Sequence, residues 1–214
     1  MRLAELSERS GVSTATIKYY LREGLLPAGR RISATQADYD DAHLRRLRLV
    51  RALIQIGRVP VATARQVLAY VDDDSLGQTI RLGAALWELP HEPEPDEEDP
   101  QTAVARAEVD RLLELLGWAT ARELGALSPN HRVLTATLVR LTHLGYPMDA
   151  EALLPYAQGL GRLAELDLDR LEDVPTPAEK VEAAVAATVL FEPVLLCLRR
   201  LAQEEESARR FGLS

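Results

Sequence analysis

The stretch that decides the fold is Gly-Val-Ser-Thr-Ala-Thr-Ile-Lys-Tyr-Tyr-Leu-Arg-Glu-Gly-Leu-Leu-Pro at residues 11–27. Leucines at helical spacing in residues 3–9 predict a short helix before it. Ser13 is a favourable N-cap for a second helix that runs to about Glu23, and Gly24 supplies its end. A short turn containing glycine separates the two helices, and this arrangement is a helix-turn-helix.

The second helix carries side chains suited to reading DNA. A recognition helix places its N-terminal turns in the major groove, where short polar side chains reach the base edges. Ser13, Thr14 and Thr16 have that size and chemistry. Further along the helix, contacts to phosphates orient it in the groove. We assign those contacts to Lys18, Tyr19 and Arg22.

The motifs around this helix occur in an order that resembles the MerR family of winged helix-turn-helix regulators. The matching stretches are Leu3–Leu6, Gly11–Ser13, Thr16–Tyr20, Gly24–Pro27, Arg30-Arg31 and Tyr39-Asp40, with Leu47–Ile56, Gly57 and Val61–Leu68 as the family's second helix pair. The resemblance covers about a third of the chain. It implies a sequence-specific transcriptional regulator that binds double-stranded DNA at a near-palindromic operator as a homodimer.

The resemblance also implies roles for single residues. Lys18 stands where the family has an arginine before two tyrosines, so Lys18, Tyr19 and Tyr20 would touch phosphates or pack at the DNA surface. Two arginines would lie in the wing and a third would face the DNA backbone from the second helix pair. The DNA contacts added in this way are Tyr20, Arg30, Arg31, Tyr39 and Arg58. A regulator of this type acts on RNA polymerase indirectly, by bending or underwinding the promoter.

Three features depart from the family pattern. The family's wing strand reads Tyr-Arg-Leu-Tyr, whereas residues 36–39 here read Gln-Ala-Asp-Tyr, so the arginine is lost and an acidic residue lies nearby. Leu21 stands where the family has a glutamate after the two tyrosines. The family's long dimerisation helix is not evident after residue 72, because residues 75–89 make only a short helix.

Charge is divided unevenly along the chain. The whole chain has a net charge of −8, yet residues 1–70 contain 12 basic and 6 acidic residues, a net of +6. The remaining residues contain 13 basic and 27 acidic residues, a net of −14. A basic head on an acidic body indicates that only the head meets phosphate.

The chain is predicted to be mainly α-helical. A winged helix-turn-helix DNA-binding domain takes residues 1–72, and an all-helical effector-binding and dimerisation domain takes residues 101–214. Between them, residues 73–100 form a short helix and a linker. The linker is predicted from four prolines and six carboxylates at residues 90–100, which favour a solvated segment. Pro193 is expected to kink or split the last helix.

Several classes of protein are not supported. Phosphate-binding loops, hydrolase motifs and metal-ligand clusters are not found in the sequence, so we expect no enzyme, no cofactor and no metal site. The single cysteine, Cys197, lies among leucines and fits a small buried apolar group better than a reactive thiol. We expect a cytoplasmic protein with no membrane contact, because no uninterrupted apolar run approaches ~20 residues.

The acidic body is expected to sense a small apolar or cationic molecule, a cation being favoured by the surplus of carboxylates. The alternative is a protein-interaction module that binds no small ligand. Aromatic side chains are the candidates for an effector pocket, although they fit an ordinary core as well. These candidates are Trp87, Trp118, Tyr146, Tyr156 and Phe191.

Dimerisation is expected to rest on the C-terminal helices, because the longest apolar helical material lies in residues 178–210. The other interpretation is that these helices only close the core of their own protomer. The candidate buried positions are Val181, Val185, Thr188, Val189, Leu195, Leu198 and Leu201.

Overall fold

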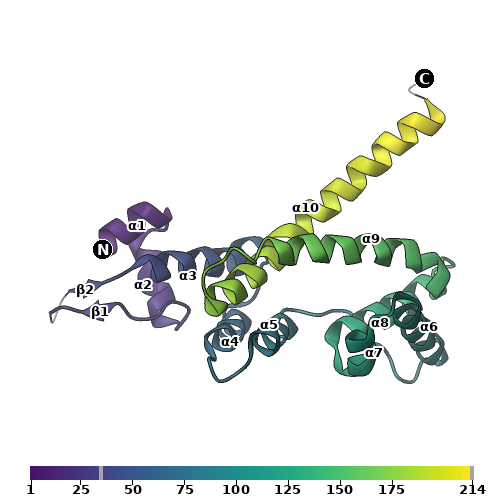
Figure 1. Cartoon of the computed structure of the whole chain (residues 1–214), viewed down its shortest axis with the longest axis horizontal. Helices are drawn as coiled ribbons and strands as arrows, with labels where there is room; N and C mark the ends of the chain where they lie inside the picture. Colours follow the sequence, from purple (N-terminus) through teal and green to yellow (C-terminus); the bar gives the residue numbers. More distant parts are fainter. Residues whose placement is uncertain (34–35, 213–214) are drawn as a thin grey trace. The chain divides into compact units, whose positions relative to one another are not determined.

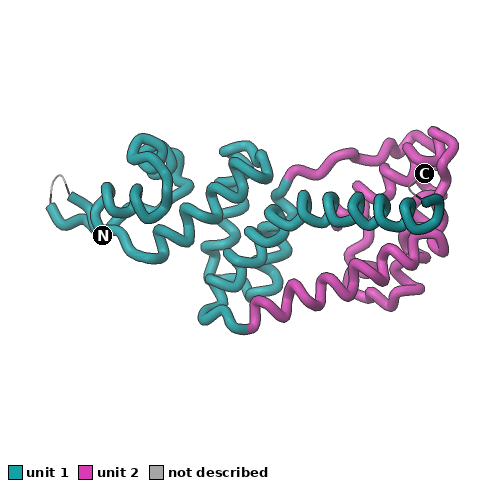
Figure 2. The backbone as a smooth tube through the Cα atoms, turned by 90° about the horizontal axis from the view of Figure 1, so that it is seen from above, with its two compact units in different colours: residues 1–89, 173–214 teal, residues 90–172 magenta. Residues whose placement is uncertain are grey.

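This computed structural model describes residues 1–33 and 36–212. The chain forms two compact units, one made of Met1–Leu89 with Asp173–Ser214 and the other of Pro90–Glu172 (Figure 2). The fold is mainly α-helical, with one two-stranded sheet (Figure 1).

The first unit opens with the expected helix-turn-helix and wing. Its elements are α1 (Leu3–Ser10), α2 (Thr14–Arg22), β1 (Arg30–Arg31), β2 (Ala37–Asp38), α3 (Asp41–Arg51), the π-helical turn η1 (Ala52–Ile56), α4 (Val61–Asp72), α5 (Gln78–Trp87) and α10 (Pro177–Phe211). Gly11 ends α1 in the left-handed conformation, which explains a glycine there. Strands β1 and β2 pair antiparallel with Arg30 opposite Asp38.

The start of α3 is fixed by its cap. The Asp40 side chain accepts a hydrogen bond from the His43 backbone N–H, and His43 Nδ1 lies 3.2 Å from the Asp40 backbone nitrogen. These reciprocal contacts form a capping box, which is worth about 0.5–2 kcal/mol. The cap thereby fixes where the wing ends and the next helix begins.

The core of the first unit includes part of the C-terminal helix. Helix α10 contacts α3, η1, α4 and α5, and Val181, Val185 and Val189 are buried in the same cluster as the helix-turn-helix leucines. Burial of a valine side chain contributes about 1.5–3 kcal/mol. Gly57 makes the close approach possible, because a Cβ atom there would lie 2.5 Å from Val189 Cγ1.

The second unit is a small helical bundle. Its elements are α6 (Pro100–Leu116), α7 (Ala119–Leu124), the 3-10 turn η2 (Gly125–Leu127), α8 (Pro129–His143) and α9 (Ala150–Asp169). Helix α6 packs against both α8 and α9, with Val109 and Leu138 almost fully buried between α6 and α8. Asp149 caps α9 by accepting a hydrogen bond of 2.9 Å from the Ala152 backbone N–H.

The structure divides the chain differently from the expected segments. Residues 101–214 do not form one unit, because residues 173–214 belong with the head. Pro193 was expected to kink or split the last helix, and it does not split it, since α10 runs through it from Pro177 to Phe211. A proline removes one backbone hydrogen bond, and the intact turns on both sides keep this helix continuous.

The expectation about apolar runs needs a correction as well. By length and composition alone, α10 is suited to cross a membrane, with a mean hydropathy of 2.0 over an 18-residue window. Glu192 and Pro193 interrupt the run of apolar residues, but the mean hydropathy over the window stays high. Only 22% of that window is buried, so much of its apolar surface is unpartnered within the protomer.

Candidate nucleic-acid interface

The first turn of α2 presents small hydroxyl side chains at the surface. Ser13 and Thr14 are exposed and Thr16 is half-buried. Ser13 Oγ accepts a hydrogen bond of 3.1 Å from the Thr16 backbone N–H and lies 2.8 Å from Thr16 Oγ1. The cap therefore fixes the Ser13 and Thr16 side chains, whereas Thr14 has no such contact among the bonds described and is the freest of the three to meet a base.

The far end of α2 is basic and partly aromatic. Lys18 and Arg22 are exposed, and the Arg22 guanidinium carbon lies 5.3 Å from the centre of the half-buried Tyr19 ring. This stacking restricts the position of the guanidinium. Its loss would cost about 0.5–1 kcal/mol. Lys18, Tyr19 and Arg22 therefore occupy the surface on which phosphate contacts were expected.

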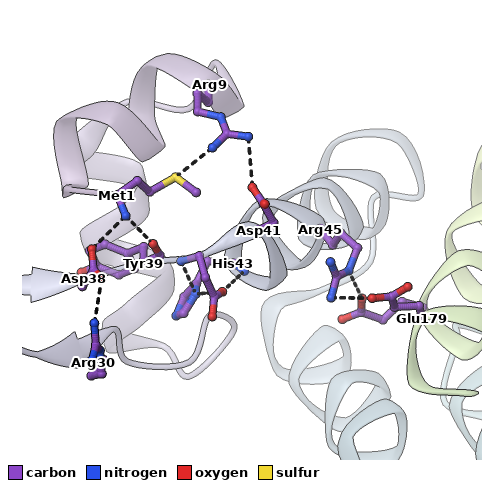
Figure 3. Close-up of polar contacts among 11 residues, drawn as sticks. Met1, Arg9, Arg30, Asp38, Tyr39, Asp41, His43, Arg45 and Glu179 are labelled. Atoms are coloured by element: carbon purple, nitrogen blue, oxygen red, sulfur yellow. Dashed lines mark hydrogen bonds and ion pairs between the residues drawn. The ribbon is translucent and has the colours of Figure 1, made fainter. Parts of the chain in front are cut away.

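The wing is anchored to the first residue of the chain (Figure 3). The Met1 amine donates hydrogen bonds to Asp38 Oδ1 at 2.8 Å and to the Tyr39 carbonyl at 2.6 Å. Arg30 Nη2 lies 3.2 Å from the other Asp38 oxygen. Hydrogen bonds from the amine and from Arg30 lower the pKa of Asp38. The acidic residue that departs from the family pattern thus holds the strand in place.

The wing arginines remain available despite these contacts. The Arg30 side chain is 81% exposed although it pairs with Asp38, and Arg31 is exposed, with its Nε donating to the Ser33 carbonyl at 3.3 Å. An exposed ion pair contributes about 0.2–1 kcal/mol. A phosphate therefore competes with Asp38 for Arg30 at little cost.

Arg58 follows η1 in an unusual backbone conformation. It is the only non-glycine residue with positive φ, at 52°, within the ranges 1–33 and 36–212. The left-handed region costs an ordinary residue of order 1 kcal/mol or more. Its side chain is exposed, so the strained backbone directs a cation to the surface.

Two arginines that sequence reasoning missed brace the helix-turn-helix. Arg51 of α3 donates to the Ser10 carbonyl at 3.1 Å, at the end of α1. Arg65 of α4 donates to the Glu23 carbonyl at 2.8 Å, at the end of α2. Each guanidinium satisfies a carbonyl at a helix C-terminus. No sequence signal separates these braces from DNA-contacting arginines, because all are single arginines on helices.

Two of the expected DNA contacts are corrected by burial. Tyr20 is 4% exposed and Tyr39 is 7% exposed, and both belong to the core of the first unit. Burial raises the pKa of Tyr20. Their rings support the recognition helix and the wing, so we leave these two out of the proposed interface. The other expected residues are Ser13, Thr14, Thr16, Lys18, Tyr19, Arg22, Arg30, Arg31 and Arg58, and these lie at the surface or half-buried.

The expected aromatic effector pocket is divided between the two units. Trp87 and Phe191 belong to the first unit, on α5 and α10. The other three, Trp118, Tyr146 and Tyr156, belong to the second unit, where they are 40%, 71% and 57% exposed. The cavity between α6 and α8 in the second unit is lined by other side chains, Val104 and Leu138 among them. A pocket built from these aromatics stays a prediction.

Comparison with known proteins agrees with the geometry. The profile of MerR HTH family regulatory proteins matches residues 1–71. The crystal structure of SCO5550 from Streptomyces coelicolor A3(2), assigned as a transcriptional regulator, is 65% identical, with a TM-score of 0.86 over 100% of this chain and 99% of that one. The chain belongs to the MerR family. No match was found among curated proteins.

MerR regulators bind DNA, and this MerR chain carries their domain with a recognition helix and a wing that both present basic side chains. The chain is therefore a transcriptional regulator of the MerR type. The likeness to SCO5550 extends over the second unit and α10 as well as the head.

Proposed function

We propose that this MerR regulator binds a near-palindromic operator as a homodimer and is controlled by a small effector. The observation that carries the DNA reading is the exposed first turn of α2 beside the exposed wing arginines, in a head with a net charge of +6 over residues 1–70. Genome-wide mapping of bound sites tests it. An inverted repeat shared by the bound sites is expected, and binding without a common sequence would contradict the proposal.

The two faces of α10 support the homodimer. Val181, Val185 and Val189 lie on one face and are buried against the head. At 100° per residue, the exposed Val194 and Leu201 fall on the opposite face, whereas the exposed Leu196 falls on the same side as the valines. The first half of α10 thus closes the core of its own protomer, as the other interpretation of the sequence held, while the second half keeps an apolar face that the protomer does not cover.

That uncovered face has the spacing of a coiled-coil seam. Steps of four and three residues separate Leu190, Val194, Cys197, Leu201, Glu204, Ala208 and Phe211, and all but the half-buried Ala208 are exposed. Six of the seven positions are apolar or weakly polar, as the a and d positions of a helix pair require. We name these seven residues the α10 seam. Cys197 is exposed rather than buried as expected, and it lies in this seam.

A second copy of the chain is the occupant that best fits the α10 seam. A two-fold operator needs a two-fold protein, and the seam spans about 32 Å at 1.5 Å per residue. Val194 and Leu201 are 49% and 57% exposed. Pairing with the same seam of another copy would bury both, and Glu204 would be the single polar a or d position, which such a pair tolerates at a cost in stability.

Sedimentation of full-length variants tests the dimer. Val194→Glu with Leu201→Glu should convert the dimer to a monomer at micromolar concentration. Leu196→Glu is the matched control, because Leu196 is 46% exposed on the other side of α10, and it should remain a dimer. A fragment ending at Leu89 is unsuitable, because it lacks the α10 valines of its own core. A double variant that stays dimeric would contradict the seam.

A membrane is the competing occupant of the apolar part of α10. Flotation of the wild-type protein with vesicles of mixed neutral and anionic lipid separates the two occupants. We expect the protein to stay with the soluble fraction and to act in the cytoplasm, where operator DNA and RNA polymerase are found. If the wild-type protein floats with the vesicles, and both Leu196→Glu and the double variant abolish this flotation, the membrane is favoured instead.

Control by a small effector is the second part of this proposal. Thermal melts with and without a candidate molecule test it, because a ligand that binds only the folded state raises the Tm. If a partner protein copurifies at fixed stoichiometry and no small molecule shifts the Tm, the second unit is a protein-interaction module. A regulator of either kind acts on polymerase through the promoter DNA and needs no catalytic site.

A further inference from the structure

A cavity of about 310 Å³ lies between α3 and α10, inside the first unit. Its walls are apolar and small, with Leu49 from α3 and Ala183 and Ala186 from α10. Val174, in the turn before α10, closes one side. The volume is at the lower end of the range of small-molecule sites, which are mostly apolar with a few polar groups.

The carboxylates at the rim of this cavity are already paired. Glu179 lies 2.9 Å from Arg45 Nη2, a contact drawn in Figure 3. Glu182 Oε1 accepts a hydrogen bond of 3.1 Å from Arg46 Nε, and Arg46 also pairs with Asp72. A cationic ligand would therefore have to displace an arginine from each carboxylate.

The arginines at the rim have unused donors. In the part of the chain that the structure describes, the Arg48 guanidinium has no ion pair or hydrogen bond, and the exposed side chain lines the cavity. Arg45 Nε is buried without a hydrogen bond, and the Glu182 oxygen that faces it is 3.8 Å away. A buried donor without an acceptor costs about 1–3 kcal/mol. The site therefore lacks a hydrogen-bond acceptor for these arginine donors, rather than a donor for its carboxylates.

We propose that this cavity is an effector site for a small molecule with an apolar body and one carboxylate. The body would lie against Leu49, Ala183 and Ala186, and the carboxylate would bind Arg48 and Arg45 Nε. The local geometry thus points to an anion, although the acidic composition of the body suggested a cation. The cavity of the second unit fits less well, because Glu108 and Asp149, its two carboxylates, already hold the start of α9.

The position of the site suggests how occupancy would reach the DNA. Helix α3 begins at the end of the wing, and α10 carries the α10 seam. A ligand held between α3 and α10 favours one placement of the seam relative to the head, and a ligand shifts an equilibrium only by its difference in affinity for the two states. This step rests on the proposed function, whereas the binding site itself does not.

Octanoate is a suitable probe, because it has an apolar chain and one carboxylate. Calorimetry and thermal melts of the full-length protein should show saturable binding and a Tm increase of about 5–10 °C at a hundred times the Kd. Octanol and octylammonium share the chain but lack the negative charge. An equal Tm increase should therefore require at least a tenfold higher concentration of either compound. Equal shifts with all three would overturn the proposed carboxylate contact.

Two variants and a control locate the binding. Arg48→Ala should weaken octanoate binding about tenfold or more by removing charge-assisted hydrogen bonds, and Ala183→Phe should abolish binding by filling the cavity. Arg140→Ala is the matched control, because Arg140 is an exposed arginine on α8 of the second unit. Wild-type affinity in both Arg48→Ala and Ala183→Phe would overturn the site, provided that far-UV circular dichroism shows both variants folded.

The affinity for the mapped operator, measured with and without octanoate, separates this inference from the proposed function. A change of threefold or more that is lost in Arg48→Ala but kept in Arg140→Ala supports an effector site. Octanoate binding that leaves operator affinity and promoter output unchanged overturns its role as an effector site. Absence of any operator binding by the unliganded and liganded protein instead contradicts the proposed function, while the calorimetry still decides whether the cavity binds an anion.

Discussion

Replacement of Gly57 by alanine tests whether α10 is part of the DNA-binding head. Gly57 has φ −72° and ψ −12°, a conformation that alanine adopts readily. In a free loop the substitution would stabilise the protein by about 0.4–1 kcal/mol, because it restricts the unfolded chain. In this structure the added Cβ would lie 2.5 Å from Val189 Cγ1 and 3.0 Å from the Leu53 carbonyl oxygen.

The sign of the effect therefore depends on α10. Overpacking of this kind costs about 1–3 kcal/mol, so after the gain in the unfolded state Gly57→Ala should destabilise the first unit by about 0.5–2 kcal/mol. That corresponds to a Tm decrease of about 2–6 °C for a chain of this size. Val189→Ala alone should cost about 2 kcal/mol, from two buried methyl groups and the space they leave.

The double variant completes the cycle. Removal of the Val189 methyl groups makes room for the Cβ at residue 57, so the double variant should be about 1–2 kcal/mol more stable than the sum of the single effects. Fluorescence of Trp87 reports unfolding of the first unit alone if Trp118, the other tryptophan, is replaced by phenylalanine. A stabilising effect of Gly57→Ala, or additive single effects, would refute the packing of α10 on the head.

Five further substitutions test the DNA interface and the buried carboxylate of Glu182. Lys18→Ala and Arg30→Ala should weaken DNA binding equally on all sequences and reduce the salt slope by about one each; unchanged slopes in both would exclude phosphate contacts. Thr14→Ala should change the operator recovered by selection from random DNA, and an identical consensus would remove Thr14 from base reading. Arg58→Gly should raise stability by about 1 kcal/mol while it weakens DNA binding, and a loss of stability would show that its backbone is not strained. Burial raises the pKa of Glu182 despite the neighbouring arginines. Its contribution to stability is therefore most favourable below its unfolded pKa of about 4.3 and is lost as pH rises through the folded value. In urea unfolding, the free energy of unfolding of Glu182→Gln should rise relative to that of the wild type between pH 4 and pH 7, and parallel profiles would contradict this.

The parts of the fold that were predictable rest on local chemistry. Ser13 caps the helix that it was expected to start, and Arg30 and Arg31 lie in the wing hairpin as the resemblance implied. These features depend on residues within a few positions of each other. Residues 90–99 lie outside the helices, but they belong to the second unit, where Glu94 pairs with Arg132 and Glu97 pairs with Arg106.

The return of α10 to the head was not predictable in the same way. Val181, Val185 and Val189 indicate an apolar helix face, but helical spacing does not specify what that face covers. The contact with Val189 depends on the absence of a side chain at Gly57, which is far away in the sequence. A glycine after a helix has many local explanations, and a sequence without structure offers no reason to pair it with a valine near the other end.

The candidate site was predictable as a surface and less so residue by residue. The resemblance placed Tyr20 among the DNA contacts, yet burial makes it a support. Arg51 and Arg65 were overlooked, because a brace on a helix C-terminus and a phosphate contact require the same side chain. Composition also favoured a cationic effector, whereas the charges around one cavity depend on which carboxylates are already paired.

The interrupted first unit has a consequence for synthesis on the ribosome. The helix-turn-helix emerges first, but the valines that complete its core emerge only after the whole of the second unit. At about 5–20 residues per second, the nascent head waits roughly 5–20 s with that part of its core open to water. The residues between the head and α10 add little to the free-energy cost of bringing the two together. They therefore delay the completion of the core during synthesis but have little effect on the stability of the finished fold. A polypeptide truncated before α10 would therefore lack part of the core of its head.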